Sequence, residues 1–294
     1  MKTALNLMTR PFNLDYTLQC GQVFRWEKHG SWWYGVAAGK AIKIKQTRDV
    51  MEYEGVKTDF IEKYFRLDDP LPVILSKISK DVHIREAVRN FRGLRLIRQD
   101  PWECLISYIC ATYKSIPAIE DMVNNLSKQF GSEIILDNCR FYAFPGPDSL
   151  ASATVSELIR CKLGFRARNV REAAKQVENG SINFDELESM RYETAKRELL
   201  KLPGVGDKVA DCVLLFSLDK LEAFPVDVWM KRTILNNYYE HFDDAFIRKV
   251  SEKKSLPSGE YRRISSFARE YFGEFAGYAQ QYLFHNERSA CQRA

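Results

Sequence analysis

The chain has 294 residues, of which 45% are hydrophobic and 28% charged, with a formal net charge of +5 at pH 7. These proportions exclude a disordered or membrane-embedded chain and are typical of a globular protein with a sizeable core. The mild positive charge is compatible with a polyanionic partner but does not identify one.

Cysteine usage indicates a reducing compartment. The cysteines number seven and no two are spaced as C-x-x-C, so the chain predicts neither a disulfide framework nor a zinc or other metal site. No apolar run reaches membrane-spanning length and no secretory pattern opens the sequence. We therefore expect a cytoplasmic protein, associated with the nucleoid if the source is prokaryotic, with no membrane partner.

The first 80 residues predict an antiparallel sheet. Short segments there alternate in hydrophobicity with a period of two and are separated by turn residues, at 23–26, 32–36, 41–46 and 50–53. Most of the aromatic side chains in these segments are the kind that pack a sheet. We assign residues 1–80 to an N-terminal antiparallel sheet domain.

From residue 81 onward the periodicity is helical. N-cap and proline signals predict a series of helices, at 81–93, from 101, and at 116–130, 154–162, 167–178, 184–200 and 265–288, with a loop at 138–149. The predicted fold is therefore α+β, with the sheet domain packed on a mainly helical body of residues 81–294.

A helix-hairpin-helix occupies about residues 190–218. Gly204, Val205 and Gly206 form a tight turn between two helical segments, and Lys208 follows in the first turn of the second helix. Exposed amides at such a turn, together with the positive end of the helix, suit a phosphate. The same hairpin could hold a structural monovalent cation.

Geometry brings Asp227 back to Lys208. The second helix advances about 16 Å, and the proline-containing segment 221–226 can return about 20 Å in extended form. Asp227 then caps a helix at 228–238. A neutral lysine is a nucleophile and a buried carboxylate stabilises positive charge, which makes this a catalytic arrangement. The alternative is a binding-only hairpin, in which Lys208 contacts phosphate and Asp227 merely caps.

The sequence LPGVGDKVADC followed by PVDVWM resembles the helix-hairpin-helix DNA glycosylases. The lysine and the KVADC form are similar to the bifunctional 8-oxoguanine DNA glycosylase/lyases of that superfamily. The resemblance implies a monomer that flips a lesion out of double-stranded DNA, with Lys208 attacking the sugar, Asp227 stabilising charge, and β-elimination nicking the strand. It implies no required cofactor, and a C-terminal iron–sulfur cluster cannot form because only Cys291 is present there.

Two further motifs resemble the base pocket of that family. In QCGQVFRW, residues 19–26, the resemblance makes the Gly21 carbonyl the probe of the lesion; a glycine needed for a turn is the alternative. In GYAQQYLF, residues 277–284, Gln280 would contact the Watson–Crick edge and Phe284 would stack on the base, with Cys212 packing its other face. Helical core packing could produce the same spacing.

Two loops align with family segments that enter the duplex. In ICATYKSIPAI, residues 109–119, Tyr113, Lys114 and Ser115 replace an asparagine run, and Ala118 replaces the arginine that reads the opposite cytosine. Tyr113 could act as an aromatic wedge. The resemblance then implies relaxed discrimination of the opposite base.

In GFRAR, residues 164–168, Phe165 and Arg166 align with an aromatic residue and an arginine that meet the orphaned base. Ordinary packing in a helix–helix turn is the alternative for both loops. Trp229 stands where the family often has a histidine that contacts phosphate. The rival functions are a hairpin glycosylase of other base specificity and a non-catalytic DNA-binding hairpin protein.

Overall fold

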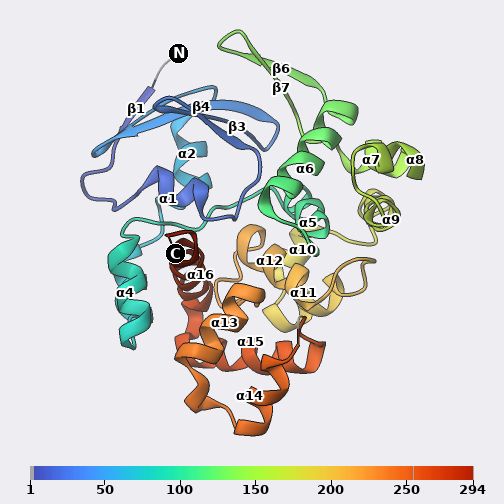
Figure 1. The fold of residues 1–294 in the computed structure, drawn as a ribbon. Helices are drawn as coiled ribbons and strands as arrows, with labels where there is room; N and C mark the ends of the chain where they lie inside the picture. Colours follow the sequence, from blue (N-terminus) through green and yellow to red (C-terminus); the bar gives the residue numbers. More distant parts are fainter. Residues whose placement is uncertain (1–2, 254, 294) are drawn as a thin grey trace.

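The computed structural model describes residues 3–253 and 255–293. Its N-terminal part is a five-stranded antiparallel sheet with the order β1-β5-β4-β3-β2, at the top of Figure 1. The strands are β1 (Thr3–Asn6), β2 (Trp26–His29), β3 (Trp32–Ala37), β4 (Lys40–Thr47) and β5 (Val50–Glu54). The predicted sheet is confirmed, with β1, which pairs with β5, added at one edge. The strand predicted at 23–26 is shifted, because β2 begins only at Trp26.

One face of this sheet is covered by α1 (Leu14–Gln19) and α2 (Thr58–Tyr64), which lie beneath it in Figure 1. Ile42, Ile44, Met51 and Tyr53 alternate along β4 and β5 and are all fully buried against these helices. Side chains at every second position share one face of a strand, so the period of two observed in the sequence produces this core.

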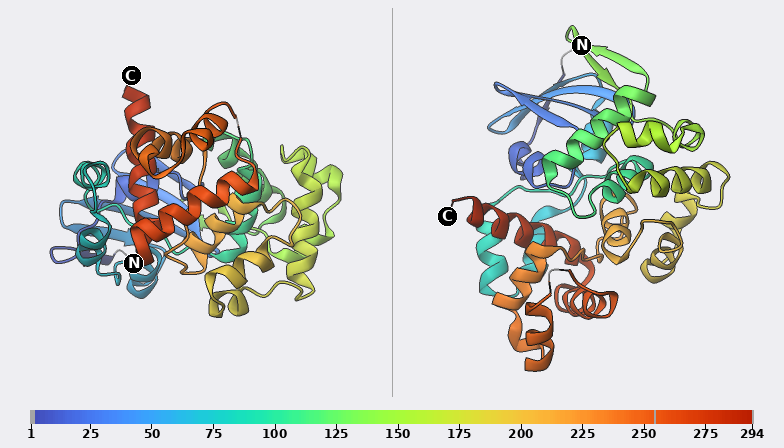
Figure 2. Two further views of the ribbon diagram at one scale, coloured as in Figure 1. Left: turned by 90° about the horizontal axis from the view of Figure 1, so that it is seen from below. Right: turned by 45° about the vertical axis from the view of Figure 1, so that its right-hand side comes forward.

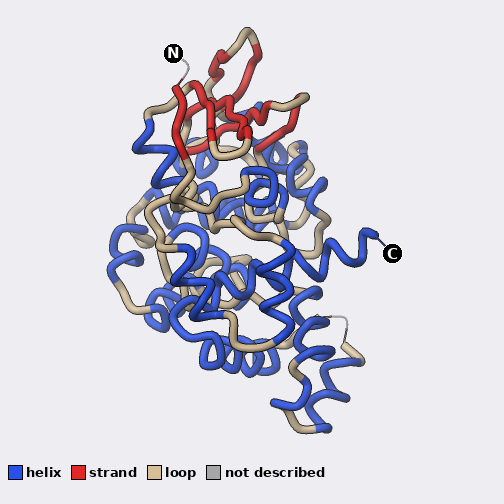
Figure 3. Tube along the Cα trace, turned by 90° about the vertical axis from the view of Figure 1, so that its left-hand side faces the viewer, coloured by secondary structure: helices blue, strands red, loops and turns tan. Residues whose placement is uncertain are grey.

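The rest of the described chain is mainly helical, as Figure 3 shows in blue, and the predicted α+β fold is confirmed. The helices are α3 (Leu71–Ile78), α4 (Val82–Asn90), α5 (Pro101–Cys110), α6 (Ile116–Phe130), α7 (Pro147–Ser152), α8 (Val155–Arg160), α9 (Arg166–Glu178), α10 (Phe184–Ser189), α11 (Tyr192–Leu199), α12 (Asp207–Ser217), α13 (Val228–Asn237), α14 (Asp244–Ser251), α15 (Ser258–Phe272) and α16 (Ala276–Arg293). None of them, within the described residues, is long and apolar enough to cross a membrane.

Three further elements differ from the prediction. The loop expected at 138–149 instead contains β7 (Cys139–Tyr142), paired with β6 (Glu133–Leu136), and the start of α7. Asp137 and Asn138 both have positive φ, which is the turn chemistry of a two-residue hairpin. The helix expected at 184–200 is two helices, and the C-terminal helical region breaks at Gly273, whose φ is +77°.

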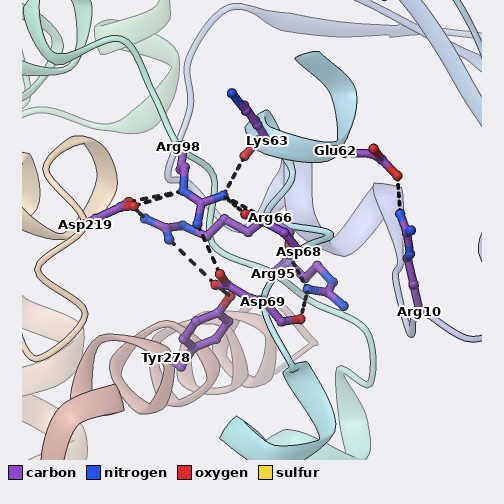
Figure 4. A network of polar contacts seen from close by, with 10 residues as sticks. All are labelled: Arg10, Glu62, Lys63, Arg66, Asp68, Asp69, Arg95, Arg98, Asp219 and Tyr278. Carbon is purple, nitrogen blue, oxygen red and sulfur yellow. Dashed lines mark hydrogen bonds and ion pairs between the residues drawn. The ribbon is translucent and has the colours of Figure 1, made fainter. Parts of the chain in front are cut away.

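A charged network joins the sheet side of the molecule to the helical body (Figure 4). Arg66 and Arg98 both pair with Asp219, which has a φ of +52° in the turn after α12. Both arginines also contact Asp69, which accepts a hydrogen bond of 2.7 Å from the Tyr278 hydroxyl of α16. The network therefore fixes the turn at which the chain reverses after α12.

Candidate active site

The hairpin lies between α11 and α12 and is packed against α9. Gly204 has a φ of +82°, and a Cβ there would lie 2.8 Å from the side-chain nitrogen of Asn169, so the position requires glycine. Val205 is buried and its amide donates to the Leu202 carbonyl at 3.1 Å. That amide is therefore unavailable to a phosphate, which leaves the exposed Gly204 and Gly206 and the first turn of α12 as the anion-binding part.

Lys208 and Asp227 are brought into electrostatic range of each other. The Asp227 carboxylate caps α13, accepting from the amides of Trp229 at 3.0 Å and Met230 at 2.9 Å. Burial raises the pKa of the Asp227 carboxyl, and the Lys208 ammonium partly offsets that rise. The Lys208 side chain is half-buried and forms no hydrogen bond or ion pair within the described chain. Its amine is thus held near a carboxylate without being locked to it.

A buried relay holds the returning segment against α12. The Tyr261 hydroxyl accepts from the Val226 amide at 3.2 Å and donates to Asp211 at 2.7 Å. Asp211 also binds the Tyr192 hydroxyl at 2.6 Å and the Lys196 ammonium at 2.9 Å. Since Val226 directly precedes Asp227, this relay from α11, α12 and α15 sets where the carboxylate lies.

A side chain at the position of Gly21 would be strained and crowded. Gly21 has a φ of +81°, and an added Cβ would lie 2.8 Å from Arg288 Nη1 and 3.0 Å from Ile116 Cδ1. The turn requirement considered from the sequence is therefore real. It does not exclude a role for the carbonyl, because close approach is the other reason for glycine.

The carbonyls around Gly21 differ from its own. Those of Gln19, Cys20 and Gln22 each accept hydrogen bonds, whereas no described residue donates to the carbonyl of Gly21. The donors are Arg288 to Gln19 at 3.2 Å, Gln281 to Cys20 at 3.0 Å, and Gln99 at 2.7 Å and Tyr108 at 3.2 Å to Gln22. The loop is held on both sides of one open acceptor.

The face of α16 beside Gly21 carries Gln280, Phe284 and Arg288 at intervals of four residues. Gln280 Oε1 and Arg288 Nη1 are buried, and neither has a hydrogen-bond partner in the described chain. Gly21 and Arg288 line a cavity of about 520 Å³, together with Ile116 and Glu120 of α6. The other predicted site residues do not line this cavity: Lys208, Cys212, Asp227, Gln280 and Phe284. Phe284 is nevertheless close, since its Cε1 would lie 3.6 Å from a Cβ on Gly21, and the Asp227 carboxylate acts on the pKa of Arg288.

Cys212 follows Lys208 by one turn and belongs to the helical core, where burial raises the pKa of its thiol to about 12. Lys208 and Asp227 both act on that thiol electrostatically, so the three groups are close together. Among the described residues, no group of three His, Cys, Asp or Glu side chains is arranged to hold a metal ion.

Residues 4–105 match a family model described as the N-terminal domain of 8-oxoguanine DNA glycosylase. The chain is 32% identical to the N-glycosylase/DNA lyase OGG1 of Arabidopsis thaliana, over 95% of this chain and 78% of that protein. It is also 32% identical to the solved 8-oxoguanine glycosylase/lyase of Clostridium acetobutylicum, in complex with double-stranded DNA containing cytosine opposite 8-oxoG. That match has a TM-score of 0.86 and covers 95% of this chain and 93% of that one. The structure of MBOgg1 in complex with a low affinity DNA ligand gives a TM-score of 0.89 at 32% identity, over 99% and 96% of the two chains.

The chain belongs to the 8-oxoguanine DNA glycosylase family. It is accordingly a DNA repair enzyme, a DNA N-glycosylase with DNA lyase activity that binds DNA. The non-catalytic hairpin protein that the sequence left open is excluded.

Two aromatic side chains of this glycosylase project from the two loops that the sequence predicted to contact the duplex. Tyr113, with a φ of +56°, is 82% exposed, and Phe165 is 67% exposed. Lys114 and Ser115 beside Tyr113 are also exposed, and Trp229 is half-buried in the first turn of α13. Both aromatic residues are accessible as wedges.

Arg166 differs from its expected role. It is only 3% exposed; its Nη2 donates to the Thr112 carbonyl and its guanidinium lies 4.3 Å from the Phe165 ring centroid. The side chain thus joins the Tyr113 loop to the Phe165 turn instead of facing an orphaned base. Sequence alone gave no signal for this, because the partner carbonyl belongs to a segment more than fifty residues away.

Other residues that shape this glycosylase site were not predicted from the sequence. The Asp211 and Tyr261 relay and Arg288 were not predicted, since their partners are distant in sequence. Gln22 is fully buried; its side chain donates to the carbonyls of Thr17 and Arg95, both at 2.9 Å. Its place directly after Gly21 in the motif was the available signal.

Proposed function

We propose that this chain excises 8-oxoguanine from double-stranded DNA and then nicks the strand through a Schiff base on Lys208. A stacked base cannot reach a pocket, so the lesion is first flipped out of the duplex. The Lys208 amine forms a bond to sugar C1′ while the bond from C1′ to the base breaks, and the electron pair leaves with the base. Asp227 stabilises the positive charge that develops on the sugar.

Strand cleavage follows from the same covalent bond. Loss of a proton from the nitrogen and opening of the sugar ring give the Schiff base. Removal of a C2′ proton then expels the 3′ phosphate by β-elimination. The nucleophile and the stabilising carboxylate are side chains of one chain, so the proposed reaction needs neither a cofactor nor a second subunit. The monovalent cation at the hairpin stays a prediction.

Recognition of the lesion rests on Gly21. Guanine presents an N7 acceptor, whereas the oxidised base carries a hydrogen at N7, so a carbonyl oxygen accepts from the lesion and repels the normal base. The observation that supports this is that no described residue donates to the Gly21 carbonyl, whereas the carbonyls of Gln19, Cys20 and Gln22 all accept hydrogen bonds. Gln280 Oε1, which also has no partner in the described chain, is free to accept from the Watson–Crick edge.

Borohydride trapping tests this proposal with three duplexes, containing 8-oxoguanine, guanine or an abasic site. We expect covalent attachment to the first and third and none to the second. Release of 8-oxoguanine without attachment would refute the Schiff base. Attachment to the abasic duplex alone would indicate another lesion specificity, to be found by measuring excision across a panel of damaged bases.

A further inference from the structure

We propose that Arg288 is a specificity-determining residue, whose Nη1 donates a hydrogen bond to the oxygen on C8 of the flipped base. The inference rests on the proposed function, because it concerns the same pocket. It adds a second contact that distinguishes the oxidised base from guanine, on the side of the ring where the two differ.

The first observation is that one terminal nitrogen of the Arg288 guanidinium is hydrogen-bonded, whereas the other has no partner in the described chain. Its Nη2 donates to the Gln19 carbonyl at 3.2 Å. Its Nη1 is buried without a partner in the described chain, and lies 2.8 Å from the position of a Cβ on Gly21. A buried donor without an acceptor is costly and calls for an explanation. The rigid fork of arginine means that fixing Nη2 also fixes the direction of Nη1.

The second observation is the order of groups along α16. From Gln280 to Arg288 the helix rises about 12 Å, with Phe284 between them. Helical side chains lean toward the N-terminus, so the Arg288 head comes back toward Phe284, and its Cζ lies 6.0 Å from that ring centroid. A base stacked on Phe284 thus has Gln280 at one end and Arg288 at the other.

The positions of these groups determine which atom of the flipped base lies next to the Arg288 guanidinium. In a purine, C8 lies at the end opposite the Watson–Crick edge, and N7 lies between them on the side where Gly21 would accept. With Gln280 at the Watson–Crick edge and Gly21 at N7, the group beyond Gly21 is next to C8. Guanine carries only hydrogen there, so Nη1 would stay without an acceptor, whereas 8-oxoguanine supplies an oxygen.

The surroundings leave the guanidinium available. Glu120 and Asp227 both act on Arg288 electrostatically, but neither forms an ion pair with it within the described chain. Burial raises the pKa of the Cys20 thiol to about 12 and lowers the pKa of His285 to about 4, so both are neutral near pH 7. Among the residues that the structure describes, no neighbouring anion therefore accepts from Arg288 Nη1.

The test compares wild type with Arg288→Ala in single-turnover excision of 8-oxoguanine and of 8-thioguanine. The second base keeps the hydrogen at N7 but replaces the oxygen with sulfur, a weak acceptor. We expect Arg288→Ala to slow 8-oxoguanine release roughly ten- to hundredfold and 8-thioguanine release much less, because a hydrogen bond from a charged donor is lost. Arg85→Ala on α4, which removes an exposed positive charge, should change neither rate.

Abasic-site trapping separates the possible failures. Because that substrate has no base, Arg288→Ala should trap it within about threefold of wild type. Equal slowing of both bases would show that Arg288 only holds the Gln19 loop, and 8-oxoguanine release at the wild-type rate would show no role at all. Absence of trapping by wild type would refute the proposed function itself. If Arg288→Ala does not fold, Arg288→Gln, which keeps a donor for the Gln19 carbonyl, replaces it in the test. Arg288→Gln must then show the same reduced ratio of the 8-oxoguanine rate to the 8-thioguanine rate.

Discussion

Two polar clusters of opposite character lie beside α12 and α16. In the first cluster, the Arg66 and Arg98 side chains are matched by Asp219 and Asp69, and Tyr278 of α16 completes the set (Figure 4). The second cluster consists of the site groups that have no partner in the described chain: the Lys208 side chain, the Gly21 carbonyl, Gln280 Oε1 and Arg288 Nη1. In the right-hand view of Figure 2, α16, in dark red, runs from the interior of the molecule to its edge.

This difference separates the polar groups that stabilise the fold from those that are available to bind a ligand. A buried charge is tolerated when paired, so the network stabilises the turn that returns Asp227 to Lys208. A buried polar atom without a partner costs free energy in the unbound protein, and a substrate that supplies the partner recovers that cost. Substitutions in the network should therefore change stability, and substitutions in the site should change chemistry.

The largest effect is expected for Lys208→Gln. Loss of the nucleophile removes covalent catalysis, so base release and borohydride trapping should both fall by several orders of magnitude. Duplex binding should stay within a few-fold, because Lys208 makes no contact that holds the hairpin. The matched control is Lys201→Gln, which removes an exposed hairpin lysine paired with Glu198 and should leave trapping intact. Full activity in Lys208→Gln would reject the assigned nucleophile.

Asp227→Asn separates charge from capping. An asparagine caps nearly as well as an aspartate, so the free energy of unfolding should change by less than about 1 kcal/mol. Stabilisation of the charged sugar is lost, so single-turnover excision should fall sharply. Thermal melting and turnover per folded molecule measure the two effects. A variant that melts early but turns over normally would mean that Asp227 is only structural.

The pH dependence of excision by the wild-type enzyme should show the titration of the Asp227 carboxyl. Burial raises the pKa of Asp227, and the proposed mechanism requires its charged form. As pH falls, Asp227 therefore becomes protonated at a higher pH than an ordinary aspartate, and excision should decline there. The decline should be missing from Asp227→Asn; an identical acid limb in the variant would assign it to another group.

Asp219→Asn tests the paired cluster. Asparagine tolerates the positive φ at this turn, so the change removes mainly the charge. We expect a loss of about 1–2 kcal/mol in the free energy of unfolding, because the Arg66 side chain is only 1% exposed, while Asp219 at 40% is partly screened. Trapping per folded molecule should stay within a few-fold. Glu274→Gln, in an exposed pair with Lys77, is the control and should cost less than about 1 kcal/mol. If Asp219→Asn kept the wild-type stability but lost trapping, the paired network would serve the chemistry and not the fold.

Local signals predicted much of this arrangement. The sheet followed from period-two alternation, and the cap at Asp227 followed from the chain length needed to return beside Lys208. The β-hairpin of β6 and β7 was not predicted, although Asp137 and Asn138 are residues that favour its two-residue turn.

The partners of buried polar groups could not be predicted. Arg166 turns toward Thr112, and Arg288 reaches Gln19 across almost the full length of the chain. Such pairings depend on how distant segments pack, and residue type alone does not specify them. The motifs therefore indicated where the site lies, whereas the split between paired and unpaired groups needed the structure.

The smallest effect concerns the base opposite the lesion. A cytosine-specific enzyme needs donors aimed at the acceptor edge of the orphaned cytosine, and arginine supplies them in a rigid fork. The resemblance of residues 109–119 to the family segment predicts Ala118 at that position, and Arg166, the other candidate reader, donates to the Thr112 carbonyl. The exposed Tyr113 and Phe165 offer stacking, which tolerates any base. Discrimination by the opposite base should therefore be relaxed.

Single-turnover cleavage of four duplexes that differ only in the base opposite 8-oxoguanine measures this discrimination. Losing one bidentate contact forfeits about 1–3 kcal/mol, so the four rates should agree within roughly tenfold. Ala118→Arg supplies a fork on the first turn of α6 and should widen the preference for cytosine, whereas Ala118→Lys, with equal charge but no planar fork, should widen it less. A wild-type preference for cytosine of a hundredfold or more would contradict relaxed discrimination. Lys114, which is exposed beside Tyr113, would then be the donor to test, since Arg166 could serve only by releasing Thr112.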